Sequence, residues 1–381
     1  MVQAIRDGCP RNKKELRAQC VNNMLWQGET AWVKEVPYDV RDEAMNDVLK
    51  AYKTSIAAKR RKFTVAFKSR KATSDSIALL AKHWKGAGIF HPTFWGKIAL
   101  RSFEPLPDKL PYDCRLQCNR GEYYLCIPQP LEIRSENQAP TFSAEGSVIS
   151  LDPGVRTFLS GYSPDGTLTN FGDKDIGKVM SLCRHMDRLQ SKWSQPGVRH
   201  KQRYQMRRAA GRMRKRVQDL IRDAHHKIAK YLCQNYRVIL LPSFESRHMV
   251  SRIKRRIGSK TARMMLTWSH YSFRQRLLDK AREYPWCKVF IVDEAYTSKT
   301  CTRCGSLHLK LGSSKSFHCP RCAYTIDRDA NGARNILLKF LTEDSRAGAT
   351  RCWGLAPGGA QASLARLDWN VLFGQESPAS S

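Results

Sequence analysis

The chain has 381 residues, which is room for two or three domains with a core each. It carries 66 Lys and Arg against 34 Asp and Glu, and its formal net charge is +32. A folded protein this basic needs an anionic partner, and nucleic acid is the usual one. No apolar run reaches 18 residues, so we expect no membrane partner. The 13 cysteines are an odd and scattered set, which indicates a reducing interior and not a disulfide framework.

The first 146 residues divide into a helical part and a strand-rich part. Apolar residues between 40 and 58 recur at helical spacing, and we expect residues 1–62 to be helical. Residues 63–146 hold short apolar or alternating runs between Gly and Pro, the pattern of a small antiparallel β-barrel or sandwich. The polar stretch 131–146 marks the boundary with the rest of the chain.

Residues 147–342 are predicted to form an α/β domain. We place its strands at 148–152, 157–163, 167–171, 238–241 and 289–292. Between and after them come a helical segment, one helix through Trp268, Phe273 and Leu277, and a last helix at 331–340. The order βββαβαβα is that of the ribonuclease H fold, in which the first, fourth and fifth strands run parallel. The tail 343–381 is rich in Gly, Ala and Ser and is predicted to be flexible.

The helical segment 176–235 is strongly basic. From Arg184 to Lys230 it holds 15 Lys and Arg and three acids. Its apolar side chains recur at helical spacing and should pack on the sheet: Val217, Leu220, Ile221, Ala224, Ile228 and Leu232. The basic side chains would then face outward and contact phosphates: Arg207, Arg208, Arg212, Arg214 and Lys215. The alternative is an ordinary solvated surface.

Two Cys-x-x-Cys pairs lie inside the segment 300–323. Cys301 and Cys304 form the first pair, and Cys319 and Cys322 form the second. Four thiolates at this spacing suit one tetrahedral zinc ion, so we predict a structural zinc ribbon. The alternative is four unrelated free cysteines. A zinc ion closed in by four thiolates does no chemistry itself.

Carboxylates are expected at the carboxyl ends of the parallel strands and on the last helix, where the ribonuclease H fold gathers them on one rim. Asp152 and Asp329 fit the first and last positions. Such a cluster holds two magnesium ions about 4 Å apart. The strand 238–241 is followed by Pro242, which cannot bind metal, so the third acid is Glu245 or Glu294. We favour Glu294, because it follows the neighbouring parallel strand at the same rim.

Four stretches together resemble the TnpB nucleases of insertion sequences and, more closely, the eukaryotic Fanzor proteins. They are Asp152-Pro153-Gly154-Val155-Arg156, Leu241-Pro242-Ser243-Phe244-Glu245, Glu294-Ala295-Tyr296-Thr297-Ser298-Lys299-Thr300-Cys301 and residues 327–335. In most TnpB sequences the strand ends in Glu, and a Pro precedes Tyr-Thr-Ser. Here the two are exchanged, as in the rearranged site of Fanzors, which agrees with the choice of Glu294.

The resemblance implies a RuvC nuclease domain that cuts DNA under the direction of a bound guide RNA, the omega RNA. It also implies that residues 1–62 are a recognition lobe and residues 63–146 a wedge barrel. Within Asp-Arg-Asp the family uses the second Asp as metal ligand, which assigns Asp329 and leaves Asp327 as support.

We therefore expect a magnesium-dependent, RNA-guided endonuclease for double-stranded DNA, encoded by or derived from a transposable element. It should act as a monomer in its ribonucleoprotein, in the nucleus of a eukaryotic host or otherwise in the cytoplasm or nucleoid. One alternative is a nuclease-inactive protein that only occupies DNA. Another is a zinc-ribbon RNA-binding protein, which would explain the charge and the cysteines but not the carboxylates.

Overall fold

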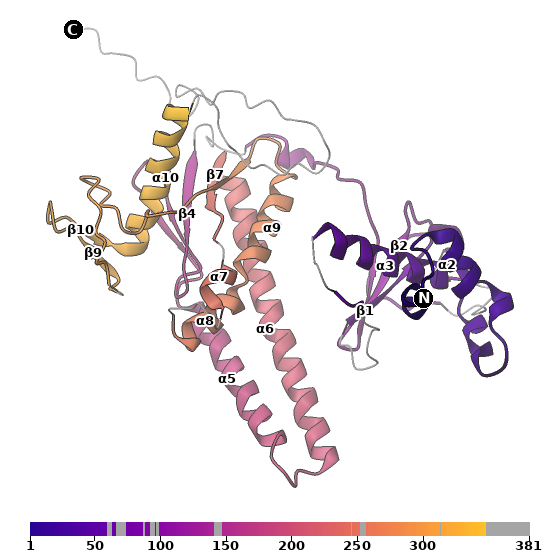
Figure 1. The fold of residues 1–381 in the computed structure, drawn as a ribbon. Helices are drawn as coiled ribbons and strands as arrows, with labels where there is room; N and C mark the ends of the chain where they lie inside the picture. Colours follow the sequence, from indigo (N-terminus) through magenta and orange to yellow (C-terminus); the bar gives the residue numbers. More distant parts are fainter. Residues whose placement is uncertain are drawn as a thin grey trace. The chain divides into compact units, whose positions relative to one another are not determined.

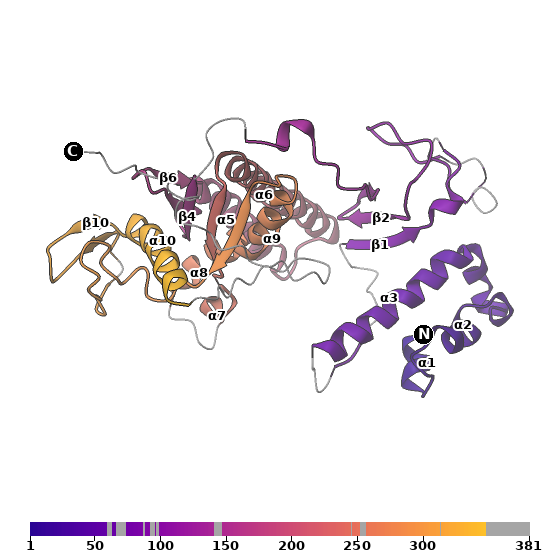
Figure 2. The same cartoon turned by 90° about the horizontal axis from the view of Figure 1, so that it is seen from above.

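The structure is a computed structural model that describes residues 1–58, 63–65, 74–86, 88–91, 96, 99–140, 147–244, 246–251, 257–312 and 314–347. The chain divides into two units, Met1–Leu131 and Glu132–Ser381. Each unit is described by itself (Figures 1 and 2). Within the described ranges, no helix is long and apolar enough to cross a membrane.

The first unit begins with the helices that the sequence predicts. They are α1 (Val2–Arg6), α2 (Lys13–Cys20), the 3-10 turns η1 (Asn23–Leu25) and η2 (Gly28–Glu35), and α3 (Tyr38–Ala57). The Asn12 side chain caps α2 by accepting a hydrogen bond of 2.9 Å from the Glu15 amide. Leu16 of α2 and Met45 of α3 are fully buried against each other's helix, so the apolar stripe of each helix forms the core of this part.

A three-stranded antiparallel sheet follows, in the order β1-β2-β3. Its strands are β1 (Ser74–Leu79), β2 (Cys114–Asn119) and β3 (Glu122–Cys126), and α3 runs beside β1 (Figure 2). Arg120 and Gly121 join β2 to β3 with φ angles of 54° and 85°, as a tight hairpin turn requires. This sheet lies within the stretch 63–146 that the sequence predicts to be strand-rich, and the bounds of that domain and its closure into a wedge barrel stay predictions.

The second unit is built on a five-stranded sheet in the order β6-β5-β4-β7-β8. Its strands are β4 (Val148–Pro153), β5 (Leu159–Tyr162), β6 (Leu168–Phe171), β7 (Val238–Pro242) and β8 (Lys288–Val292). β4, β5 and β6 pair antiparallel, whereas β7 is parallel to both β4 and β8. This is the predicted ribonuclease H topology.

Helices cover both faces of this sheet (Figure 1). The chain supplies α5 (Asp175–Trp193), α6 (His200–Asn235), α7 (Ser246–Val250), α8 (Ser259–Trp268), α9 (His270–Ala281) and α10 (Arg328–Ala347). Ile149, Leu151 and Ile239 pack with α5, α6 and α9, while Val148 and Leu240 pack with α10. Because side chains alternate along a strand, residue parity decides which face a side chain takes.

Three expectations need correction. Leu220 is 43% exposed, because it lies to the side of the buried stripe that Val217, Ile221, Ile228 and Leu232 form on α6. The single helix expected through Trp268 is two helices, since Ser269 adopts the left-handed conformation (φ 56°) and ends the first one. The last helix continues to Ala347, beyond the expected start of the tail at 343, and residues 348–381 lie outside the described ranges.

Candidate active site and metal centre

Asp152 lies near the end of β4, on the sheet face that packs against α10. Two residues earlier on the same face, the Ser150 hydroxyl donates a hydrogen bond of 2.7 Å to the backbone oxygen of Ala333 on α10. Next to Ala333 is Gly332, and a Cβ atom placed there would lie 2.4 Å from the Oδ2 atom of Asp152. The backbone of α10 therefore touches the Asp152 carboxylate, and only glycine leaves room for it.

We predict that Gly332→Ala disturbs the site without breaking the helix. The new methyl group must displace the Asp152 carboxylate, so the free energy of unfolding should fall by about 1–3 kcal/mol. Gly177→Ala on α5 is the matched control: a Cβ there meets nothing within 4 Å, so this variant should gain about 0.5–1 kcal/mol. Urea denaturation of both variants measures the difference. Equal effects of the two substitutions would contradict the close approach at Asp152.

The two acids of Asp-Arg-Asp have different roles. Asp327 ends the ribbon strand β10 (Thr325–Asp327), and its Oδ1 atom accepts hydrogen bonds of 2.9 Å from the Asp329 amide and 3.2 Å from the Ala330 amide. This is the geometry of a helix N-cap, so Asp327 starts α10. The Asp329 carboxylate, in the first turn of α10, is left to face the site.

Asp152, Pro242 and Glu294 occupy even-numbered positions, and the even-numbered residues of these strands face α10. Glu294 and Pro242 are therefore expected on the same face of the sheet as Asp152. In the parallel pair β7–β8, Leu240 lies opposite Phe290 and Pro242 opposite Val292, and Phe290 and Val292 both pack on the α10 side. Glu294 follows Val292 by two residues and continues this row past the strand end. The other sequence candidate, Glu245, lies outside the described residues.

The electrostatics of Asp152 connects it to both other predicted acids. Burial raises the pKa of Asp152 well above its usual range, and the nearby charges of Asp329 and Glu294 raise it further. The pKa of Asp329 is raised by burial and by Asp327, and that of Glu294 by burial and by Asp293. Like charges gathered in a half-buried place repel each other unless cations offset them, so this donor set fits hard divalent ions such as magnesium.

Basic side chains stand around this acidic centre. Arg328 lowers the pKa of Asp152 and Asp329, and Lys315 and Arg156 also lower that of Asp329. Their contribution is smaller than that of burial, so the net shift of each carboxyl pKa remains upward. These cations were not singled out in the sequence, because they come from the ribbon, the turn after β4 and the start of α10.

The turn after Asp152 is held from the opposite face of the sheet. A Cβ atom on Gly154 would lie 2.5 Å from the backbone oxygen of Thr157, which explains the glycine in this turn. The Trp268 indole donates to the Val155 oxygen at 2.9 Å, and the His270 Nε2 donates to the Gly154 oxygen at 3.1 Å. Burial lowers the pKa of His270 to about 4, so the imidazole is neutral. The helix break between Trp268 and His270 turns both side chains toward this turn.

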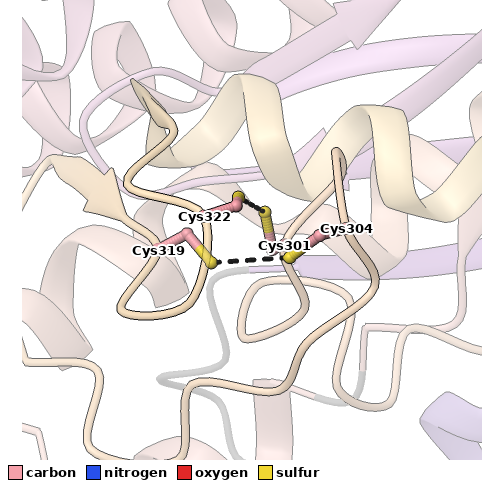
Figure 3. A group of neighbouring side chains, drawn as sticks. All are labelled: Cys301, Cys304, Cys319 and Cys322. Carbon is pink, nitrogen blue, oxygen red and sulfur yellow. Dashed lines mark hydrogen bonds between the residues drawn. The ribbon is translucent and has the colours of Figure 1, made fainter.

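The four cysteines of the ribbon meet as predicted (Figure 3). Their sulfur atoms all lie within 4.8 Å of one another, with 3.7 Å between Cys301 and Cys322 and 3.6 Å between Cys304 and Cys319. Sulfur ligands at about 2.3 Å from a tetrahedral zinc ion stand about 3.8 Å apart. Within the described ranges, this is the one group of potential ligands drawn together so tightly, and it could hold one zinc ion. The three carboxylates are spaced more widely.

The five basic residues predicted to contact phosphates all lie on α6. Arg207, Arg208, Arg212 and Arg214 are exposed, and Lys215 is half-buried. The Arg208 guanidinium lies over the Tyr204 ring, 5.7 Å from its centroid. Further along the helix, Val217 and Ile221 are buried in the core of the second unit, which anchors α6 to the sheet.

The chain combines a ribonuclease H-like sheet, half-buried acids at the ends of its parallel strands and a four-cysteine ribbon before its last helix, which together define a RuvC-like fold. Comparison with known proteins agrees: the family described as "Cas12f1-like, TNB domain" matches residues 270–336. "Putative transposase A625R" of Paramecium bursaria Chlorella virus 1 is 30% identical over 330 residues, covering 83% of this chain and 72% of that protein. The chain belongs to the TnpB family.

Two further relatives are similar over most of this chain. "TnpB-like protein L770" of Acanthamoeba polyphaga mimivirus is 28% identical over 318 residues, which is 78% of this chain and 56% of that protein. "Putative RNA-guided DNA endonuclease InsQ" of Escherichia coli (strain K12) is 27% identical over 326 residues, which is 81% of this chain and 76% of that protein. The chain thus spans little more than half the length of the mimivirus relative.

Proposed function

We propose that this protein is an RNA-guided DNA endonuclease, encoded by or derived from a transposable element. The observation that carries the proposal is the half-buried Asp152 carboxylate, which the α10 backbone approaches at Gly332 and whose pKa is raised by burial and then by Asp329 and Glu294. The related InsQ protein of Escherichia coli, named a putative RNA-guided DNA endonuclease, supports the same activity. The reaction is the hydrolysis of a phosphodiester bond.

The chemistry divides between the acids and the cations of the site. Asp152, Glu294 and Asp329 would hold two magnesium ions, which activate water and stabilise the leaving oxygen. Partial burial of the carboxylates limits competition from water and strengthens their hold on divalent ions. Arg156 and Lys315, whose charges lower the pKa of Asp329, would contact the phosphate group of a bound substrate. The four thiolates would hold zinc, which shapes the ribbon and takes no part in the reaction.

The partners are a guide RNA of the omega type and double-stranded DNA, bound by a monomer. The net charge of +32 suits the binding of two nucleic acids, whose phosphate groups are negatively charged. The helices of 1–62 would serve as the recognition lobe, and the strands of 63–146 as the wedge.

We predict that the α6 cations bind phosphates without reading sequence. Replacing Arg207, Arg208, Arg212, Arg214 and Lys215 by Ala should weaken RNA binding uniformly across sequences. Each lost phosphate contact should lower the slope of log affinity against log salt by about one unit. Filter binding at several salt concentrations measures the slope.

A control for this variant comes from two other α6 cations, each of which forms an ion pair within the helix. Arg222 lies 3.2 Å from Asp219, and Lys227 lies 2.8 Å from Asp223, both within α6. Replacing Arg222 and Lys227 by Ala should change the slope less per residue. If the five-residue variant keeps both affinity and slope, α6 is a solvated surface and not a nucleic-acid interface.

The activity itself is tested on the purified ribonucleoprotein. RNA that copurifies with the protein is sequenced, and a DNA target complementary to its variable end is incubated with magnesium. We expect cleavage of this target and none of a scrambled one. Guided binding without cleavage would leave the nuclease-inactive alternative, and RNA binding without any guided DNA binding would leave the zinc-ribbon RNA-binding protein.

A further inference from the structure

Three side chains on one face of α10 form hydrogen bonds to the segment that carries Glu294. Asn331, Asn335 and Lys339 follow each other at intervals of four residues, so they lie in one row along the helix. All three side chains bond to the stretch between Asp293 and Thr302. We call these three residues the α10 ladder. The same helix carries Asp329 in its first turn, so the ladder connects the loop of one predicted metal ligand to the helix of another.

The two asparagines bond only to backbone. Asn335 donates from Nδ2 to the oxygens of Thr297 (2.8 Å) and Thr300 (2.6 Å). Asn331 donates from Nδ2 to the Thr300 oxygen (2.8 Å) and accepts from the Thr302 amide at Oδ1 (3.2 Å). The exposed fractions of Asn331 and Asn335 are 0% and 5%. Buried bonds of this kind hold a loop in one conformation, since breaking them leaves unpaired polar groups out of reach of water.

The lysine holds both chain neighbours of Glu294. Its Nζ atom lies 2.5 Å from Asp293 Oδ2 and 3.3 Å from the Ala295 oxygen. Lys339 thus pairs with the acid next to Glu294, and this bond lowers the pKa of Asp293. The carboxylate of Glu294 is thereby left for the site that it shares with Asp152.

The need for such support follows from the position of Glu294. It follows the last residue of β8 that pairs with β7, in a loop where Tyr296 has a φ of 66°. Asp152, in contrast, lies within a central strand of the sheet. A ligand on a loop is placed less precisely than one on a strand unless other contacts fix the loop. The ladder supplies those contacts from the far side of the loop.

We infer that Asn331, Asn335 and Lys339 are positioning residues, which hold the Glu294 loop against α10 so that Glu294 and Asp329 face the same divalent ions. The inference rests on the proposed function. It also connects the ribbon to the site, because the clamped residues Thr300 and Thr302 lie on either side of the first zinc ligand, Cys301. Residues that orient metal ligands without binding the metal themselves typically change metal affinity or activity by about 10–100-fold when replaced.

The test uses the full chain with zinc bound and measures Mn²⁺ affinity by calorimetry, without RNA or DNA. Asn335→Asp keeps the shape of the side chain but cannot donate to the oxygens of Thr297 and Thr300. We expect it to weaken Mn²⁺ binding by about 10–100-fold and to speed amide hydrogen exchange over 294–302. Asn331→Asp should have a smaller effect, because it still accepts from the Thr302 amide.

Three comparisons make the result decisive. Asp152→Asn defines which Mn²⁺ binding belongs to the carboxylates. Asn235→Ala is the matched control, since it removes a solvent-exposed bond of 2.7 Å from the Asn235 side chain to the Tyr231 oxygen on α6 and should change neither quantity. Lys339→Met replaces Asn335→Asp if that variant does not fold, as judged by near-ultraviolet circular dichroism.

Unchanged Mn²⁺ affinity and unchanged amide exchange in a folded Asn335→Asp protein would contradict the inference that the α10 ladder positions Glu294. The same conclusion follows if the wild-type protein shows no Mn²⁺ binding that Asp152→Asn removes. The proposed function can fail separately. If the wild-type ribonucleoprotein cuts no target, but Asn335→Asp still speeds exchange over 294–302 and weakens Mn²⁺ binding, the positioning role of the α10 ladder is supported and the nuclease function is contradicted.

Discussion

Replacing Asp152, Glu294 or Asp329 by Ala should reduce guided DNA cleavage at least about a thousandfold, which corresponds to about 4 kcal/mol of barrier. Each substitution removes one of the three proposed metal ligands, of which Asp329 and Glu294 both raise the pKa of Asp152. Guided binding should survive, because the basic face of α6 is not touched. Cleavage of a labelled target and its binding in a gel-shift assay, measured on the same preparations, separate the two effects.

Two other acids serve as controls for this prediction. Asp327→Ala removes the N-cap of α10, so it should cost about 1 kcal/mol of stability and leave most of the cleavage. Glu245→Ala should cut like the wild-type protein. If Glu294→Ala cuts normally while Glu245→Ala does not, Glu245 is the third metal ligand and Glu294 does not take part.

Removing zinc is the second change with a large expected effect. Binding of structural zinc contributes about 10–16 kcal/mol to the folding of isolated zinc-finger peptides. Cys319→Ser, or a strong chelator, should therefore unfold the ribbon around β9 (Ser316–His318) and β10. Cleavage should fall as well, since the knuckle at Cys301 adjoins the residues that α10 clamps. The sheet of the second unit should remain folded.

The measurements are zinc content by atomic spectroscopy and amide hydrogen exchange over 300–327. Cys126→Ser is the matched control, because Cys126 is an exposed free thiol on β3 in the first unit. It should keep its zinc and its cleavage. Purified wild-type protein without bound zinc, or a Cys319→Ser ribbon that exchanges as slowly as the wild type, would contradict the prediction.

The helices, the strands and the four-cysteine ribbon could be predicted from the sequence. Each is encoded by neighbours along the chain: the period of apolar residues sets a helix or a strand, and two short Cys-x-x-Cys pairs set a knuckle each. The order of the five strands followed from the same local patterns, and the parallel pairing of β4, β7 and β8 confirms it. Asp152 and Asp329 could be singled out because their places in that order are known.

Other features depend on contacts between residues far apart in the sequence. The close approach of Gly332 to Asp152 and the bonds of the α10 ladder arise only when α10 packs on the sheet. The break at Ser269 was also missed, because an apolar period runs on through a single left-handed residue. Local spacing thus determined the elements of this protein and singled out the candidate acids Asp152, Glu294 and Asp329. The shape of the site was decided by tertiary packing, since a helix can touch a carboxylate only where the fold brings its backbone within reach.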